Sequence, residues 1–238
     1  MKKMLSISLG SPARDHVVRC KLLDQEIEIE RRGTDADFRK AVELFRAYDG
    51  VVDAFGVGGI VFFMRVDGRR YHWRDARQIR DAIRVSKVGD GNRVKPLLER
   101  RAVAALDRHL QTQDRRSLSQ MSALVTAAVG RYDLATALRA ASCRMTYGDF
   151  MFGLGAPLPV HSLRAVRAVG AVMLPVITRL PFRWFYDLGD HQLAEPDEKF
   201  GKYYDRHDII AGDFLQIRSH NAIGPERKDL PYEYHYDG

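Results

Sequence analysis

The residues best arranged for chemistry lie between Ser122 and Asp149. An apolar, β-branched run ends at Gly130, a segment with one apolar helical face follows, and a second run, Cys143 to Tyr147, precedes Asp149. This is the order of a βαβ nucleotide-binding unit, in which N–H groups at the helix start bind a pyrophosphate. An acid about 20 residues further on binds the ribose. The order therefore predicts a cofactor site in which Gly130 forms the turn and Asp149 binds the ribose of the cofactor. The alternative, that Asp149 contacts no ligand, remains open.

The turn of this unit departs from the dinucleotide pattern. The motif G-x-G-x-x-G is absent, Gly130 is its one glycine, and Asp133 stands near the expected phosphate. A carboxylate there repels a pyrophosphate unless Arg131 turns in to compensate. The order of elements therefore predicts the architecture, whereas the turn leaves the ligand open.

A second acid is expected at the same edge. The segment HDIIAGDF, residues 207–214, predicts a strand that ends near Asp213. Ligands of α/β proteins bind at the carboxyl ends of parallel strands, so Asp213 is a further cofactor-binding candidate. The glycine cluster at residues 56–59 precedes a strand instead of a helix, which predicts a sharp turn and not a dinucleotide fingerprint.

The elements around these residues predict two α/β domains. The first is a substrate-side domain over residues 1–110. It is expected to contain extended runs at 4–9, 16–23, 26–31, 51–55 and 60–66, with a hairpin turn at Asp67–Gly68 into 69–74. Its helices are expected at 36–48, 75–84 and 94–110. Thr34 or Asp35 is expected to cap the first helix, with contacts to substrate hydroxyls as the alternative, and Asp75 to cap the second. Val85 to Val88 predicts a further strand.

The polar segment 111–118 predicts a linker, and residues 119–238 a Rossmann-like parallel-sheet domain. Within it we expect a loop over 150–160 and a helix over 162–178, kinked or stopped near Pro175. Cys20 and Cys143 are expected to be buried free thiols in strands. The histidines His161, His191 and His207 have no spacing that indicates a metal site.

Composition narrows the class of protein. With 45% apolar and 29% charged residues the 238-residue chain is expected to be globular. The net charge of +7 comes mostly from arginines spread over helices, which favours a solvated basic surface over a nucleic-acid groove. The N-terminal apolar run is too short for a signal peptide, and the longest apolar run, 168–177, is too short to span a bilayer. We therefore expect a cytoplasmic protein without a transmembrane segment.

Aromatic side chains beside arginines form a separate cluster at residues 179–186. Phe182, Trp184, Phe185 and Tyr186 are interpreted as the rim of a core or as a homo-oligomer contact. The alternatives are a base-stacking surface and an interfacial membrane contact.

Motifs along the chain resemble those of bacterial quinate 5-dehydrogenase-like proteins, which are related to shikimate dehydrogenases. They include SISLGSPARD, VDAFGVGGI, GDGNRVKPLLERR, TYGDFMFGLGAPLP, RLPFRWFY and KYYDRHDIIAGDF, and reach to about Arg218. The resemblance implies an α/β domain followed by a Rossmann-like domain, and oxidation of a ring hydroxyl with NAD or NADP. In that family an acid stands at the place of Gly130 and a glycine at that of Asp133, and the chain continues beyond HDIIAGDF. We therefore expect a C-terminal sheet that is incomplete through truncation or a shifted reading frame.

The resemblance also implies catalytic roles, because a lysine and an aspartate of shikimate dehydrogenases face the nicotinamide. The corresponding assignment is Lys95 as proton relay, Asp90 as its orienting partner and Asn92 as a substrate hydrogen-bond donor. The alternative is that Asp90 and Asn92 only build a turn and that Lys95 is solvated.

Two main hypotheses follow. The first is an NAD(P)-dependent oxidoreductase acting on a small acidic polyol such as quinate or shikimate. The second is a non-catalytic Rossmann-like protein that binds a nucleotide or an acidic metabolite. A third hypothesis is a binder of nucleic acid or of a membrane surface, which rests on the net charge and on the arginine and aromatic residues at 179–186.

Overall fold

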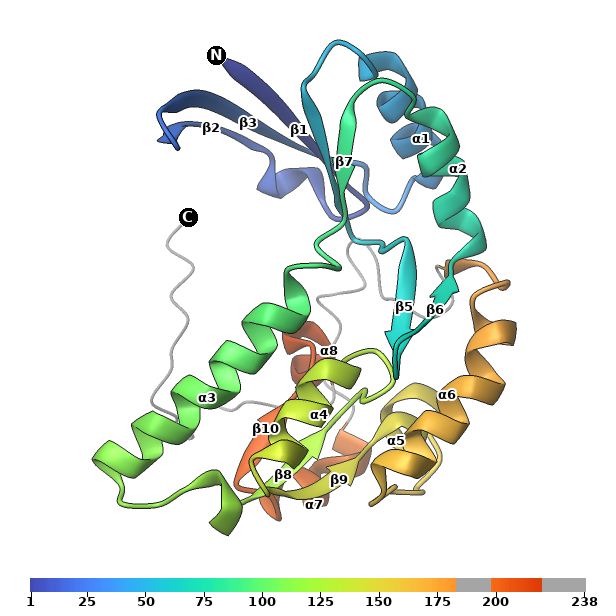
Figure 1. Ribbon diagram of the computed structural model, residues 1–238. Helices are drawn as coiled ribbons and strands as arrows, with labels where there is room; N and C mark the ends of the chain where they lie inside the picture. Colours follow the sequence, from blue (N-terminus) through green and yellow to red (C-terminus); the bar gives the residue numbers. More distant parts are fainter. Residues whose placement is uncertain (183–197, 220–238) are drawn as a thin grey trace.

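The computed structural model describes residues 1–182 and 198–219, which form two α/β lobes (Figure 1). The N-terminal lobe has a five-stranded sheet of order β2-β3-β1-β4-β7, and the C-terminal lobe a three-stranded sheet of order β10-β8-β9. A two-stranded hairpin, β5-β6, reaches from the first lobe to the second. The expected α/β class is thus confirmed.

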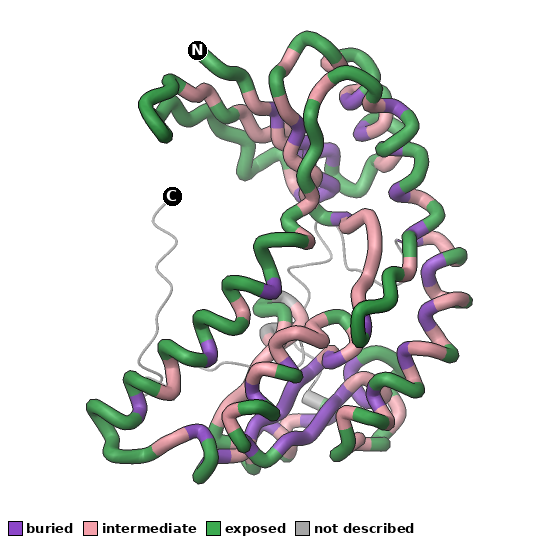
Figure 2. The backbone as a smooth tube through the Cα atoms, viewed as in Figure 1, coloured by how far each residue is buried: buried purple, intermediate pink, exposed green. Residues whose placement is uncertain are grey.

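The N-terminal sheet is parallel except at one edge. Strands β1 (Lys2–Ser8), β3 (Gln25–Gly33), β4 (Ala54–Gly58) and β7 (Lys87–Gly89) run in parallel, and β2 (His16–Leu22) is antiparallel to β3. Short 3-10 helices lie at Pro12–Arg14, Leu118–Gln120 and Glu198–Phe200. Alternation puts Leu5 and Ile7 of β1 in the core with Phe45 and Phe55. Figure 2 shows that β2 is exposed instead, so Cys20 is exposed and the expectation that it is buried is wrong.

Helices α1 (Phe38–Tyr48) and α2 (Arg74–Ala82) pack against each other and form the N-terminal core with this sheet. The caps differ from those expected. The Asp37 carboxylate accepts from the Lys40 N–H at 2.9 Å and caps α1, because Asp35 has a left-handed backbone (φ 48°) and Thr34 is buried beside β1. Asp75 lies in the first turn of α2, whose N-cap is Trp73.

The hairpin β5 (Phe63–Val66) and β6 (Arg69–His72) confirms the turn predicted at Asp67–Gly68. Both turn residues have positive φ, 49° and 79°, as a two-residue hairpin loop of this kind requires. The hairpin packs on the C-terminal lobe, where Val66 lies against Gly170. An exposed ion pair of 2.9 Å between Asp67 and Arg167 lies at the same contact.

The C-terminal sheet contains the predicted βαβ unit. Strand β8 (Ser122–Val125) leads through a turn at 126–131 into α4 (Tyr132–Ala140) and then into β9 (Arg144–Tyr147), which pairs in parallel with β8. Strand β10 (Ile209–Ala211) pairs in parallel with the other side of β8. Leu124 and Val125 are fully buried in the middle of this sheet.

Helices complete the lobe: α3 (Lys95–Gln113), α5 (Asp149–Leu154), α6 (Leu163–Ile177), α7 (Gly201–Asp205) and α8 (Phe214–Ser219). Helix α3 packs against α4 and extends three residues into the segment predicted as a linker. Residues 150–154 are helical, because Met151 and Phe152 are buried against Phe200 and Tyr204 and this packing outweighs the glycine-rich composition. Helix α6 continues through Pro175 to Ile177.

Among the described residues, no helix combines the length and the apolar character needed to cross a bilayer.

Candidate functional site

The C-terminal sheet has a topological switch point between β8 and β10. From β8 the chain crosses through α4 to β9 on one side, and it reaches β10 on the other side only after α5, α6 and α7. Ligands of α/β sheets bind outside the carboxyl ends of the strands at such a point. Figure 1 shows that β4 and β7 of the other lobe run toward this part of the molecule.

Two predicted site residues meet at the switch point. Arg131, in the turn after β8, directs its Nη2 atom to Oδ2 of Asp213, which follows β10, at 3.0 Å. Its Nη1 atom donates to Oε1 of Glu99 on α3 at 2.9 Å. The Glu99 side chain is 12% exposed and that of Asp213 is 54% exposed, so the two partners differ in solvent access. The turn, β10 and α3 are thereby joined through one guanidinium group.

The charges around Arg131 hold it in the cationic form. Burial lowers the pKa of the Arg131 guanidinium, but hydrogen bonds and charges from Glu99 and Asp213 outweigh that effect and raise it overall. A permanent cation therefore lies at the switch point, with one well-buried and one exposed carboxylate partner.

Lys95 lies beside this cluster, as the first residue of α3. Desolvation of its ammonium group, followed by the positive charge of Arg131, lowers its pKa, against the opposing charges of Asp213, Glu99 and Asp90. The residue as a whole remains exposed to solvent. The fold thus brings Lys95 to Arg131, 36 positions later in the chain, and gives it a proton that is easier to remove than that of a free lysine.

Asp90 and Asn92 build the turn before α3. The Asp90 carboxylate accepts from the backbone N–H groups of Phe62 at 2.8 Å and Asn92 at 3.1 Å. The Asn92 side-chain amide donates to the Phe63 carbonyl at 3.0 Å and to Asp90 at 2.6 Å. Both side chains therefore tie the turn to the start of the β5-β6 hairpin, which agrees with the interpretation that they build a turn.

Thr34 and Asp35 lie at the carboxyl end of β3. The Thr34 hydroxyl donates to the Ser8 carbonyl at 3.3 Å and is buried, while the exposed Asp35 donates its N–H to the Gly10 carbonyl at 3.1 Å. Neither side chain joins the cluster around Arg131 through a contact among the described residues.

Asp149 follows β9, at the edge where an acid was expected, but its carboxylate turns into the protein. Oδ1 accepts from the Val129 N–H at 2.7 Å, and Oδ2 is buried without a hydrogen-bond partner among the described residues. Burial raises the pKa of Asp149 to about 6, against hydrogen bonds led by that of Val129, which lower it. The carboxylate thus occupies an N–H of the turn that a phosphate would otherwise use.

The β5-β6 hairpin also contacts the start of α4, next to this turn. Asp133, in the first turn of α4, forms an ion pair of 2.8 Å with Arg65 of β5. Gly130 has room for a Cβ atom, which would lie 3.7 Å from the Ala127 carbonyl oxygen and 3.8 Å from Met64. No close backbone approach therefore requires glycine at position 130.

Residues that the sequence did not single out complete the site. Thr126 is fully buried between Gly148 and Gly212, and its hydroxyl lies 3.0 Å from Gln216 Oε1. Glu99 is four residues after Lys95, and this i,i+4 spacing of opposite charges on a helix was a signal that could have identified it.

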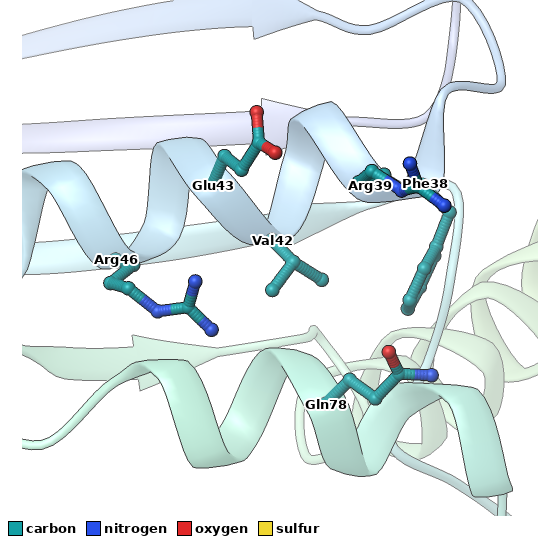
Figure 3. Close-up of a pocket in the computed structure, with 6 residues that line it drawn as sticks. All are labelled: Phe38, Arg39, Val42, Glu43, Arg46 and Gln78. Carbon is teal, nitrogen blue, oxygen red and sulfur yellow. The ribbon is translucent and has the colours of Figure 1, made fainter.

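Two further observations concern the rest of the molecule. An open groove of about 430 Å³ lies between α1 and α2, with Val42 and Phe38 over Gln78 (Figure 3). It contains none of the predicted site residues. Within the ranges that the structure describes, no three His, Cys, Asp or Glu side chains gather as a metal site would require. His207 instead contacts the Thr146 hydroxyl at 2.8 Å.

The segments with Trp184, Phe185, Tyr186 and His191, and the tail beyond residue 219, lie outside the described residues. Phe182 is buried and packs edge-to-face on Trp73 with ring centroids 4.9 Å apart.

Comparisons with known proteins agree with the two-lobe arrangement. Residues 3–90 match the model of a domain of unknown function (DUF8753), and residues 93–227 match that of a second one (DUF8754). The two matches meet between β7 and α3. A search of curated proteins and a search of solved structures each gave no match. Because the second match spans more than half of the chain, this protein belongs to the family of the domain of unknown function DUF8754.

Proposed function

We propose that this protein binds a small anionic ligand, a nucleotide or an acidic metabolite, at the carboxyl ends of β8 and β10, and that it does so without catalysing a reaction. The observation that carries the proposal is the unequal pairing of Arg131. Glu99 is a well-buried partner, whereas Asp213 is 54% exposed at 3.0 Å. Exposed ion pairs contribute little free energy, so an incoming carboxylate or phosphate can replace Asp213.

Lys95 supplies a second positive charge for such a ligand. It neighbours Arg131 closely enough for the two charges to affect each other, and an anion between them would relieve that repulsion. The ligand would therefore bind as a competitor of Asp213, and Lys95 would favour the ionised form of the ligand.

The contacts of the turn after β8 support the binding of an anion other than a dinucleotide. Asp149 takes the Val129 N–H, and Asp133 is paired with Arg65. A pyrophosphate at this turn would have to displace one carboxylate and lie near another, which costs binding free energy.

An NAD(P)-dependent oxidoreductase of the quinate or shikimate dehydrogenase kind is the second candidate. Two observations favour it: the β8-α4-β9 unit of a nucleotide-binding fold, and the lowered pKa of Lys95, which suits a proton relay at a ring hydroxyl. In that case NAD or NADP would be the cofactor, and the residue that orients Lys95 would be Asp213 or Glu99 in addition to Asp90.

The two candidates are separated by binding and turnover measurements on the full chain. Calorimetry with ATP, NAD, NADP, quinate and shikimate tests for a ligand, and absorbance at the reduced nicotinamide band tests for turnover with quinate or shikimate. Binding of an anion that is weakened in Lys95→Gln, without turnover, supports the first candidate. Turnover that is lost in Lys95→Gln supports the second. Lys21→Gln is the matched control, because Lys21 is also an exposed lysine and lies on β2 of the other lobe.

A cytoplasmic location and a homo-oligomeric state belong to the same proposal. Cell fractionation tests the first, and light scattering of the purified chain tests the second.

A further inference from the structure

A second groove lies where the two lobes meet, away from the switch point. It is bounded by the start of α2, by the β5-β6 hairpin and by the end of α6, and has a volume of about 520 Å³. Small-molecule sites commonly have volumes of about 300–1,000 Å³. Its lining is rich in basic side chains and includes Arg74, Arg77, Arg80 and Arg179, together with His72.

The spacing of these arginines brings their charges together. Arg74, Arg77 and Arg80 are three residues apart on α2, so successive side chains are neighbours on the helix surface. Arg179 enters from the other lobe directly after α6, where the Arg74 N–H donates to the Thr178 carbonyl at 2.9 Å. Cations from both lobes thus converge on one hollow.

Few acids of the described residues neutralise this set. Arg77 pairs with Asp81 at 3.5 Å, but both side chains are more than 60% exposed, so the pair is weak. Arg179, which follows the C-cap of α6, donates to the Pro175 carbonyl in the last turn of that helix. In the described part of the chain, Arg74, Arg80 and Arg179 form no ion pair with a carboxylate. The arginines therefore repel one another, and a bound anion would remove that repulsion.

We propose that this groove is a binding site for a small polyphosphate, such as the phosphate chain of a nucleoside triphosphate. A guanidinium group can donate two parallel hydrogen bonds to the oxygens of one phosphate. Several guanidinium groups around one groove therefore suit an anion with several charges. The row from Arg74 to Arg80 is about 9 Å long at 1.5 Å per residue. This is far shorter than one turn of duplex DNA, about 34 Å, so a small ligand fits the groove better than a nucleic-acid backbone.

Such a ligand would connect the lobes. Its phosphates would contact α2 of the N-terminal lobe and Arg179 of the C-terminal lobe together, next to the packed rings of Trp73 and Phe182. Binding would then stabilise the arrangement of the two lobes in addition to each lobe by itself.

The test is calorimetry of the full chain with inorganic tripolyphosphate and with ATP, supported by thermal unfolding. We expect one tripolyphosphate per chain, and at least a tenfold weaker affinity in Arg179→Ala and in the double variant Arg77→Ala/Arg80→Ala. Arg108→Ala is the matched control, because Arg108 is also an exposed arginine that donates to a carbonyl four residues earlier in its helix. Its affinity should change less than twofold.

Three results would overturn the proposal: no tripolyphosphate binding at millimolar concentration, an equal loss in Arg108→Ala, or a tighter, equally arginine-dependent binding of a 20-base-pair duplex. The variants Lys95→Gln and Asp213→Asn should leave tripolyphosphate affinity unchanged. This outcome separates the groove from the switch point, so either proposal can fail without the other.

Discussion

Replacing Asp149 by asparagine should change how stability depends on pH. The Asp149 carboxyl has an ordinary pKa of 3.8 and a pKa of about 6 in the folded protein, because burial disfavours its ionised form. The folded chain therefore takes up a proton before the unfolded chain does as pH falls. Above about pH 6 the buried charge lowers the free energy of unfolding, and this penalty disappears progressively as pH falls toward 3.8. A difference of about two pH units corresponds to about 3 kcal/mol.

Urea unfolding of wild type and Asp149→Asn between pH 4 and pH 8 measures this effect. The asparagine side chain keeps an acceptor for the Val129 N–H but places an NH₂ group at the buried Oδ2 position, which costs about 1–3 kcal/mol at every pH. The predicted quantity is therefore the change with pH. Relative to wild type, the variant should gain about 2 kcal/mol in unfolding free energy from pH 4 to pH 8, because part of the penalty is already present at pH 4.

Groups whose pKa is lowered, such as Asp49 and Asp208, lose their stabilising effect at low pH in both proteins and cancel in the comparison. Asp24→Asn, at a side chain that is 96% exposed, is the control and should give a flat difference. If the difference between wild type and Asp149→Asn were equally flat, the reasoning about this buried carboxylate would be refuted.

Three further predictions concern the same lobe. Tyr147→Phe should be neutral or should stabilise the fold by about 1 kcal/mol in urea unfolding, because the buried hydroxyl has no hydrogen-bond partner among the described residues; a loss above that size would reveal one. Gly212→Ala should destabilise the fold by about 1–3 kcal/mol in the same assay, since the new Cβ would lie 2.2 Å from the Thr126 hydroxyl. Gly130→Ala is the control, because its new Cβ would lie no closer than 3.7 Å to any atom beyond its two neighbours in the chain; equal effects of the two variants would contradict the packing argument. Asp133→Gly should improve NAD affinity in calorimetry if the oxidoreductase candidate holds; an unchanged affinity would count against it.

The sequence predicted the elements that depend on local pattern. The βαβ order around β8 and the Asp67–Gly68 hairpin follow from periodicity and turn chemistry, which act over a few residues. The sequence also placed Arg131 and Asp213 near one sheet edge, because strand ends in a parallel sheet share an edge.

What the sequence did not predict depends on contacts between distant segments. The direction of the Asp149 carboxylate depends on the backbone of the turn at Val129, and the conformation of 150–154 on packing against Phe200 and Tyr204. The pairing of Arg131 with Glu99 depends on how α3 packs against α4. The arginine groove depends on the meeting of α2 with the end of α6, which are about 100 positions apart in the chain. None of these contacts is encoded in a local pattern.

The most direct test of the switch-point proposal is the affinity of Asp213→Asn for an anion whose binding to the wild-type chain in calorimetry depends on Lys95. The substitution removes the exposed carboxylate that competes for Arg131 and keeps the size of the side chain. The proposal predicts an affinity about two- to fivefold higher than wild type, because an exposed pair of this kind contributes about 0.5–1 kcal/mol. Asp24→Asn, at the exposed pair with Lys21, should leave it unchanged. An affinity of Asp213→Asn equal to or lower than that of wild type would contradict the proposal that ligands bind by replacing Asp213 at Arg131.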